Sequence, residues 1–238
     1  MCADLAVKAT DLTKVYGDGE AAVHALTDVS FEIPRGEFVV LQGPSGCGKT
    51  TLLNQLGALE APTSGDVESN GYKLNGLDDD GRTDYRLHTV GFVFQFYNLV
   101  PSLTAYENVA LIAELTGDDV KQRSEHVLSA VGLGDRMDHF PGQMSGGEQQ
   151  RVSIARGLVK NPPLMLCDEP TGALDTETGI QVLRLLRSIT DAGDRTIMVV
   201  THNSQISEIA NRVIELKDGV VTGMHPNDNP KDPGDVAW

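Results

Sequence analysis

The sequence predicts an α/β fold with a mainly parallel sheet, an antiparallel β subdomain at the N-terminus and an inserted α-helical subdomain. Three observations predict it. Short β-rich runs alternate with turns in the first third, residues 96–158 have helical patterning, and the last third repeats strand, helix and strand. An alternation of strands and helices is typical of a parallel sheet with right-handed crossovers.

The N-terminal part is predicted to form strands joined by turns. Leu5–Tyr16 and Val23–Ile33 are rich in β-forming residues and are separated by the turn sequence Gly-Asp-Gly-Glu. Gly36–Gly43 is a short apolar run ending in glycine, which suits a buried parallel strand. A helix is expected from Thr50 onward, and two further short strands are expected within residues 61–76.

The middle of the chain changes from strand to helix. Val90–Gln95 is apolar enough for another strand. After it, Thr104 and Glu107 have the Ser/Thr-x-x-Glu spacing of a capping box, and Ser145 and Glu148 repeat that spacing. In a capping box the side chains of both residues accept hydrogen bonds from each other's backbone N–H groups, which favours the start of a helix.

The last third predicts a βαβ unit followed by a hairpin. Pro163–Glu169 and Arg195–His202 are apolar runs that end in polar residues, and a helix over about residues 176–189 joins them. The pair Asp218–Gly219 is a hairpin-turn signal between two strand-like segments.

We expect one domain over residues 1–238. Residues 5–95 and 159–222 form its β subdomain and core, residues 96–158 form the helical subdomain, and residues 223–238, rich in Pro and Asp, form a flexible tail.

Composition excludes several classes of protein. The chain has 238 residues, 40% of them hydrophobic, so wholesale disorder is excluded. No apolar run is long enough for a membrane span and no signal peptide is evident, so we expect a cytoplasmic protein. Three cysteines are too few for a disulfide framework or a zinc site. A net charge of −15 argues against nucleic-acid binding and leaves open a salt-rich cytosol or an ordinary acidic enzyme.

A glycine-rich loop carries the strongest functional signal. The sequence Gly-Pro-Ser-Gly-Cys-Gly-Lys-Thr fits Gly-x4-Gly-Lys-Ser/Thr and lies between a predicted strand and a predicted helix, as a P-loop NTPase core requires. Its backbone N–H groups and the helix dipole favour phosphate. We expect Lys49 to reach the β- and γ-phosphates of ATP and Thr50 to hold Mg²⁺. The residues expected to contact the nucleotide here are Gly43, Pro44, Ser45, Gly46, Cys47, Gly48, Lys49, Thr50 and Thr51. For Cys47 alone, the more common role of such a residue is that of a small filler of the loop.

Two acids follow the strand predicted at residues 163–169. Asp168 lies at its carboxyl end, where ligands of open α/β sheets bind, and is expected to be a second Mg²⁺ ligand. Glu169 can accept a proton from, or orient, an attacking water. On its own such an acid pair is weak evidence for a catalytic site, because strands often end in acidic residues. Its position downstream of a phosphate-binding loop favours a catalytic role.

A second anion-binding helix start is predicted at residues 144–158. Ser145, Gly146 and Gly147 precede a helix, and within one chain a second phosphate site would be redundant. It is explained if these residues cap the γ-phosphate bound to another copy. This stretch, with the phosphate loop and the acid pair in the same order and spacing, resembles the ATP-binding cassette (ABC) ATPases over roughly residues 5–222.

The resemblance implies further roles. Tyr16 would stack on adenine, and Gln95 would contact Mg²⁺ or water and sense the transport partner. Asp175 would lie in the loop that crosses the dimer, and His202 would contact the γ-phosphate. The cofactors implied are ATP and Mg²⁺, and the activity implied is ATP hydrolysis coupled to transport by a homodimer that forms head to tail on ATP binding.

The segments FQFYNLVPSLTAYENV and DEPTGALD resemble the MacB and LolD group, whose membrane partners resemble FtsX. That group implies an ATPase held at the inner face of the cell membrane by permease subunits, acting in lipoprotein, peptide or toxin export or extraction. The alternative is control of a cell-envelope or cell-division partner without transport. Glu148 departs from the glutamine of many members, and we expect it to act as a helix cap that points away from the triphosphate.

Overall fold

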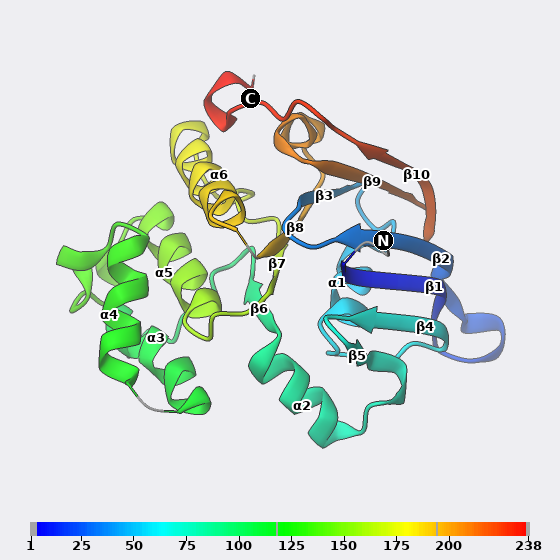
Figure 1. Cartoon of the computed structure of the whole chain (residues 1–238), viewed down its shortest axis with the longest axis horizontal. Helices are drawn as coiled ribbons and strands as arrows, with labels where there is room; N and C mark the ends of the chain where they lie inside the picture. The colour runs from blue at the N-terminus through cyan, green and yellow to red at the C-terminus, as the bar shows by residue number, and fades with distance from the viewer. Residues whose placement is uncertain (1–3, 118, 194, 237–238) are drawn as a thin grey trace.

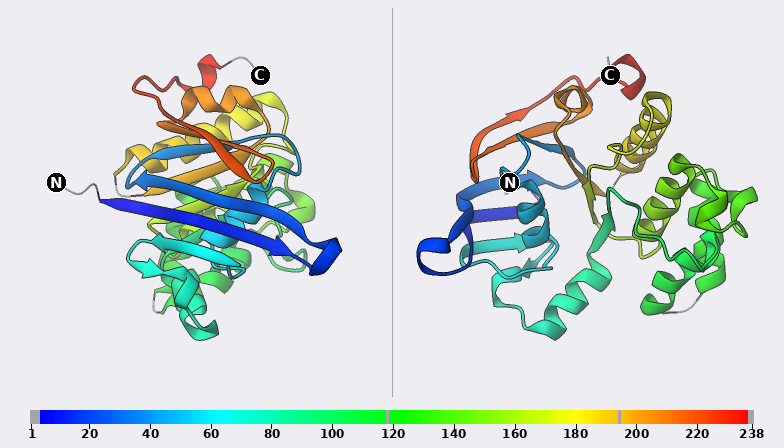
Figure 2. Two further views of the ribbon diagram at one scale, coloured as in Figure 1. Left: turned by 90° about the vertical axis from the view of Figure 1, so that its right-hand side faces the viewer. Right: turned by 180° about the vertical axis from the view of Figure 1, so that it is seen from behind.

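The computed structural model describes residues 4–117, 119–193 and 195–236. Its centre is a six-stranded sheet of order β10-β9-β3-β8-β7-β6, flanked by a four-stranded sheet of order β2-β1-β4-β5. The helices α3, α4 and α5 lie on the side of the central sheet opposite the four-stranded sheet (Figure 1; Figure 2). The expected α/β architecture with an antiparallel subdomain and a helical insertion is therefore confirmed.

The four-stranded sheet is antiparallel and comes from the N-terminal third. Its strands are β1 Leu5–Tyr16, β2 Val23–Pro34, β4 Ser64–Ser69 and β5 Tyr72–Lys73. The six-stranded sheet contains β3 Phe38–Gln42, β6 Val90–Val93, β7 Leu164–Asp168, β8 Thr196–Thr201, β9 Arg212–Lys217 and β10 Val220–Pro226. All of its neighbouring pairs are parallel except the β9–β10 hairpin.

Alternation along β3 divides the core into two layers. Val39 and Leu41 face the layer that contains α1 Lys49–Leu56 and the antiparallel sheet, whereas Phe38 and Val40 face the helices on the other side. The second layer is covered by α3 Ala105–Ala113, α4 Val120–Ala130, α5 Gly146–Leu158 and α6 Thr176–Asp191. Both faces of the strand are buried, as expected for a parallel sheet.

Both predicted capping boxes form. The Thr104 side chain accepts from the Glu107 N–H, and the Ser145 side chain accepts from the Glu148 N–H. Each glutamate in turn accepts from the backbone N–H of its partner. The starts of α3 and α5 are therefore fixed by local sequence, at the residues where the spacing predicts them.

The helix α2, Asp79–His88, was not expected. Asp78 caps it by accepting from the Gly81 N–H, and its last turn carries basic residues. Tyr85 is buried, and its hydroxyl donates to the carbonyl of Leu56 at 2.7 Å. Tyr85 is the buried residue of an otherwise polar sequence. The segment therefore lacks the apolar periodicity from which a helix can be predicted.

The flexible tail expected over residues 223–238 is corrected over its described part. Residues up to Pro226 belong to β10, and the following segment packs against α6. Arg184 of α6 pairs with Asp232 at 2.7 Å, and Val236 is buried in the second core layer. An apolar anchor and ion pairs hold a sequence whose Pro and Asp content alone indicates a loop. Residues 237–238 lie outside the described part.

No helix among the described residues has the length and apolar character needed to cross a membrane.

Candidate functional site

The loop between β3 and α1 lies against a cavity of about 570 Å³. Gly48 precedes α1 with a φ of +105°, and a Cβ there would lie 2.4 Å from the carbonyl oxygen of Ala25. A Cβ on Gly43 would lie 2.0 Å from the carbonyl oxygen of Leu216. Glycine is therefore required at both ends of the loop, once for its conformation and at both places for space.

The loop residues divide into those that line the cavity and those that support it. Ser45, Gly46, Gly48, Lys49, Thr50 and Thr51 line it. Gly43, Pro44 and Cys47 do not, and Cys47 is buried in the first core layer, which favours a packing role for its side chain. The start of α1 carries no side-chain cap, so its backbone N–H groups are left to a ligand.

Lys49 is fixed by the loop itself. Its ammonium donates to the carbonyl oxygens of Gly43 at 2.7 Å and Pro44 at 2.8 Å. An ammonium has three hydrogens, and the third has no partner among the described residues. The loop thus holds a positive charge in place with one donor left for an anion.

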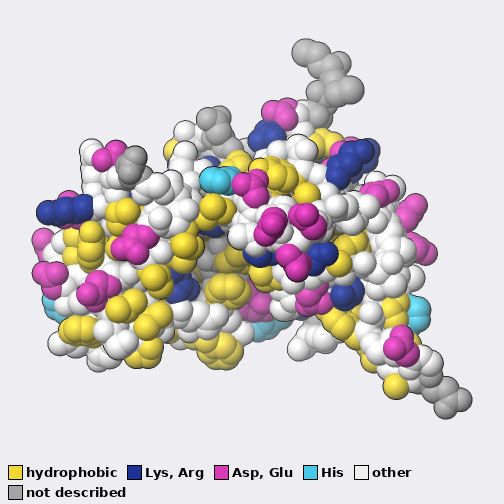
Figure 3. All heavy atoms as spheres, turned by 90° about the horizontal axis from the view of Figure 1, so that it is seen from below, with side chains coloured by type: hydrophobic (Ala, Val, Ile, Leu, Met, Phe, Trp, Pro, Cys, Tyr) yellow, Lys and Arg dark blue, Asp and Glu magenta, His cyan; other side chains and the backbone are white. Residues whose placement is uncertain are grey.

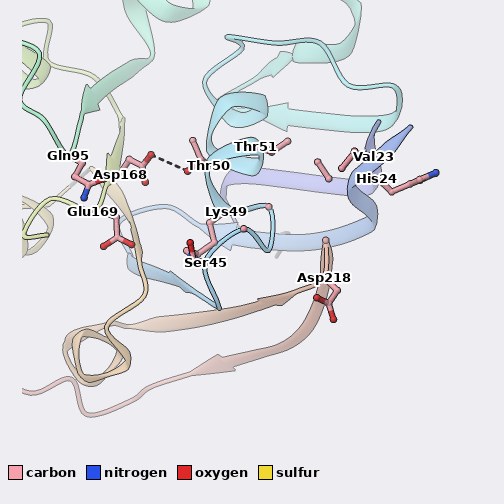
Figure 4. A pocket seen from close by; sticks show the side chains of 14 residues that line it. Val23, His24, Ser45, Lys49, Thr50, Thr51, Gln95, Asp168, Glu169 and Asp218 are labelled. Atoms are coloured by element: carbon pink, nitrogen blue, oxygen red, sulfur yellow. Dashed lines mark hydrogen bonds between the residues drawn. The ribbon is translucent and has the colours of Figure 1, made fainter. Parts of the chain in front are cut away.

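A hydroxyl and a carboxylate meet beside the lysine. The Thr50 hydroxyl donates to an Asp168 carboxylate oxygen at 3.3 Å, and Gln95 and Glu169 line the same cavity (Figure 4). Burial raises the pKa of Asp168, and the neighbouring charge of Glu169 adds to that effect, whereas Thr50 and Lys49 oppose it. A bound cation would offset the cost of keeping this carboxylate ionised.

These oxygen donors fit Mg²⁺, which is usually bound by one or two carboxylates and completes its shell with further oxygen atoms, from water and substrate phosphate above all. Among residues 4–117, 119–193 and 195–236 no cluster of three or more His, Cys, Asp or Glu side chains could hold a metal alone. Thr50, Asp168 and Gln95 would therefore hold the ion only together with a bound phosphate.

Glu169 and His202 form a pair at the ends of β7 and β8. The Nδ1 atom of His202 lies 2.8 Å from Glu169 Oε1, and the Thr201 hydroxyl donates to Glu169 Oε2 at 3.4 Å. Glu169 has a φ of +47°, a strained conformation for a residue with a side chain. Strain of this kind, held by partners on both carboxylate oxygens, indicates a carboxylate whose position matters.

Sequence reasoning missed one end of the cavity. Val23, His24 and Ala25 of β2 line it, as do Asp218 and Gly219 of the β9–β10 turn (Figure 4). The turn is joined to the phosphate loop, because the Gly219 N–H donates to the Cys47 carbonyl at 3.0 Å. The hairpin itself was predicted, but its position beside the loop depends on strands far apart in the sequence.

Tyr16 lies at the end of β1 and is not among the residues that line the cavity. Its hydroxyl donates to Glu60 at 2.7 Å, and the Lys14 ammonium lies 5.0 Å from the centre of its ring. The ring is therefore held from the protein side by two charged neighbours.

The residues Ser145–Glu148 also lie outside the 570 Å³ cavity beside the phosphate loop, hereafter the phosphate cavity. A Cβ on Gly146 would meet the Tyr97 hydroxyl at 2.9 Å, and a Cβ on Gly147 would meet Thr178 Cγ2 at 2.1 Å. Gly147 is thus needed for packing within its own chain, whereas a Cβ at Gly146 would require only a shift of the Tyr97 hydroxyl. The structure does not bring this helix start together with the phosphate loop.

Asp175 caps α6 and accepts from the Thr178 N–H at 3.1 Å, a bond that lowers its pKa. It lines a smaller cavity of about 290 Å³ together with Glu169 and His202. Asp175 therefore lies beside the candidate catalytic pair, although not in the phosphate cavity.

Comparison with known proteins agrees with this geometry. Residues 26–172 match the family described as ABC transporter. The chain is 45% identical over 222 residues to the uncharacterized ABC transporter ATP-binding protein MJ0796 of Methanocaldococcus jannaschii, covering 90% of this chain and 94% of that protein. It is also 45% identical over 218 residues to the macrolide export ATP-binding/permease protein MacB of Aggregatibacter actinomycetemcomitans, of which it covers 34%.

A solved structure gives the same fold. The dimeric post-hydrolysis state of the ATP-binding cassette MJ0796 bound to ADP and Pi superposes with a TM-score of 0.84 at 43% identity, covering 92% of this chain and 98% of that one. The family match, the full-length relatives and the phosphate-loop geometry agree. The chain belongs to the ABC transporter family, as an ATP-binding subunit that is an ATPase of that family's type.

Proposed function

We propose that two copies of this chain close head to tail around two MgATP molecules and thereby drive a membrane permease of the FtsX, MacB or LolC type. One observation carries the proposal. The phosphate loop and the acid pair line one cavity, and His202, 2.8 Å from Glu169, lines the smaller cavity beside it. The second anion-type helix start, Ser145–Gly147, lies outside both cavities. A second copy can supply that missing wall. The MJ0796 cassette, described as a dimer bound to ADP and Pi, supports this arrangement.

In the proposed site each side chain has a defined task. Lys49 presents its remaining hydrogen to the β- and γ-phosphates, and Tyr16 stacks on adenine. Mg²⁺, held by Thr50, Asp168 and Gln95 with phosphate oxygens, would neutralise charge on the triphosphate. Ser145, Gly146 and Gly147 of the second copy donate to the γ-phosphate from the other side.

Water attack is assigned to the pair at the ends of β7 and β8. Glu169 orients the water and accepts its proton. His202 holds Glu169 in place through the 2.8 Å contact of its Nδ1 atom, and the His202 ring also faces the γ-phosphate. Asp175 lies at the seam between the copies. Catalysis then consists of positioning and charge stabilisation, without a covalent intermediate on the protein.

The permease would dock beside Gln95. A groove of about 300 Å³ is lined by apolar side chains such as Phe92, Phe94 and Leu111, with Arg156 and Lys160 at its side. Phe96, two residues after Phe94 in the sequence, is 75% exposed. Hydrophobic side chains gather over the helical half of the molecule (Figure 3). Because Gln95 precedes Phe96 directly, a partner seated here would register the state of the nucleotide cavity.

Dilution of the isolated ATPase tests the shared site. Turnover per chain should fall when the protein is diluted below the concentration at which ATP-dependent dimers form. The same turnover at every dilution, with sedimentation showing monomers, would contradict the proposal.

Copurification tests the partner. A tagged chain carrying Glu169→Gln should retain an integral-membrane permease with a large outer domain on a column containing ATP. Transport of lipoprotein, peptide or toxin by the reconstituted complex would establish export or extraction. A complex that binds and hydrolyses ATP but moves none of them would establish control of an envelope partner instead.

A further inference from the structure

The capping boxes at the starts of α3 and α5 differ in one hydrogen bond. In both, the glutamate accepts from the backbone N–H of the capping residue, at 2.7 Å for Thr104 and Glu107 and at 2.8 Å for Ser145 and Glu148. At the start of α5 there is one additional contact: the Ser145 hydroxyl lies 2.9 Å from the same Glu148 oxygen. The side chain that should meet the partner's phosphate is thus engaged with a carboxylate.

The direction of this bond follows from the charge of Glu148. The backbone N–H of Ser145 lowers the pKa of Glu148 most, with further lowering by the Ser145 hydroxyl, Arg136 and Arg151. The carboxylate is therefore ionised at neutral pH and can only accept, so the Ser145 hydroxyl must donate its single hydrogen to it. That same hydrogen is the one a phosphate oxygen would require.

The carboxylate is held in place from its other side. The Arg136 guanidinium lies 3.4 Å from Glu148 Oε1, while Oε2 takes the two bonds from Ser145. Glu148 therefore does not swing freely out to solvent. The expectation that it caps the helix is confirmed, but it points at Ser145 and competes with any anion that approaches the helix start.

We propose that Glu148 is a positioning residue that holds the hydroxyl hydrogen of Ser145 until the triphosphate on a second copy displaces it, and so sets the ATP concentration at which the two copies close. This inference rests on the proposed head-to-tail dimer. Hydrogen bonds to a charged acceptor are roughly twice as strong as bonds between neutral groups, so Glu148 makes closure harder than an uncharged side chain would.

The test replaces the carboxylate by its amide. In a Glu169→Gln background, which holds closed dimers, Glu148→Gln should lower the ATP concentration for half-maximal dimer formation by about fivefold, since the charge-assisted bond and the like-charge repulsion are lost. Dimer fraction is measured by sedimentation over an ATP series. The difference between the two proteins should narrow in molar KCl, where charges are screened.

A matched control and a second variant keep the test specific. Glu107→Gln removes the equivalent carboxylate from the capping box of α3. It should lower the melting temperature about as much as Glu148→Gln does, but it should leave the ATP concentration for half-maximal dimer formation unchanged. In a Ser145→Ala background, Glu148→Gln should keep only the part of its effect that comes from charge repulsion, because the hydroxyl hydrogen that it releases is gone.

Three results would overturn the inference: an unchanged or higher ATP midpoint in Glu148→Gln, an equal shift in Glu107→Gln, or an undiminished shift without the Ser145 hydroxyl. If the Glu169→Gln parent formed no ATP-dependent dimer, the proposed function would fail and this inference with it. A parent that dimerises normally while Glu148→Gln has no effect refutes only the role of Glu148.

Discussion

The starts of α1 and α5 are both glycine-containing helix N-termini, yet they leave their backbone N–H groups in opposite states. At α1 the residue before the helix is Gly48, and no side chain caps the exposed N–H groups. At α5 the Ser145 and Glu148 side chains cap each other's backbone N–H groups. The first helix start is open to an anion, and the second is closed by its own sequence.

This difference indicates what each half of a shared site must do. The α1 side holds the charged machinery, with Lys49 fixed by loop carbonyls and Glu169 fixed by His202. In the proposed dimer this side binds the triphosphate of its own chain. The α5 side would first give up internal hydrogen bonds, so it would engage only when a phosphate is presented to it. A binding half and a conditional half together would make closure of the proposed dimer depend on ATP.

The largest effect is expected when the chemical group beside α1 is removed. Glu169→Gln should lower the turnover number by about 100- to 10,000-fold, the range of general-base catalysis, while ATP still binds. ATP-dependent dimers should accumulate. Steady-state ATPase assays with nucleotide titrations measure both, and Glu125→Gln on α4 is the control. Near wild-type turnover would remove Glu169 from its assigned role.

Loss of the Lys49 ammonium should weaken the binding of ATP itself. Lys49→Ala removes an ammonium that bonds two loop carbonyls and would bond phosphate. Since hydrogen bonds to charged groups contribute about 1.5–3 kcal/mol, ATP affinity should fall roughly 10- to 100-fold. Calorimetric titration measures this, with Lys8→Ala on β1 as a distant control. Unchanged affinity would show that the open helix start alone binds the triphosphate.

The conditional half can be tested through its packing. Gly147→Ala places a Cβ against Thr178 Cγ2 and should destabilise the fold by about 1–3 kcal/mol. Adding Thr178→Ala should restore most of that stability. Gly142→Ala, where a Cβ would meet nothing within 4 Å, is the control for the substitution itself. Chemical unfolding measures all three, and a failed rescue would show that Gly147 is not required by Thr178.

The smallest effect concerns Asp168, whose pKa is raised by burial. A carboxyl with a raised pKa in the folded state binds its proton more tightly there than in the unfolded chain, so its charged form destabilises the fold above that pKa. Asp168→Asn should therefore raise the melting temperature of the nucleotide-free protein at pH 8. The gain should shrink as the pH falls through the range in which Asp168 protonates, and a pH-independent gain would contradict this origin.

Local sequence predicted the elements that local rules control. The capping residues Thr104 and Ser145 begin their helices, and the glycine-rich loop joins β3 to α1 where its spacing requires. The helix α2 escaped because Tyr85 alone anchors it, and its hydrogen bonds reach Leu56 and Ser69, which no periodicity records.

The remaining differences have the same origin in long-range contacts. Val236 anchors the chain end against the second core layer, and the Asp218–Gly219 turn completes one end of the cavity beside the phosphate loop. Both depend on where distant strands and helices come to lie. The residue types could be identified from the sequence, but their neighbours could not.

Mixing two inactive variants tests the shared site most directly. Lys49→Ala chains lack a working phosphate loop, and Ser145→Arg chains lack a working second helix start, so each alone should be nearly inactive. In a mixed dimer the intact loop of one chain meets the intact Ser145 of the other. Mixing should restore ATPase activity well above that of either variant alone, with one complete site in each mixed dimer. Full activity of Ser145→Arg alone, or no recovery in mixed dimers shown to form, would contradict the shared site.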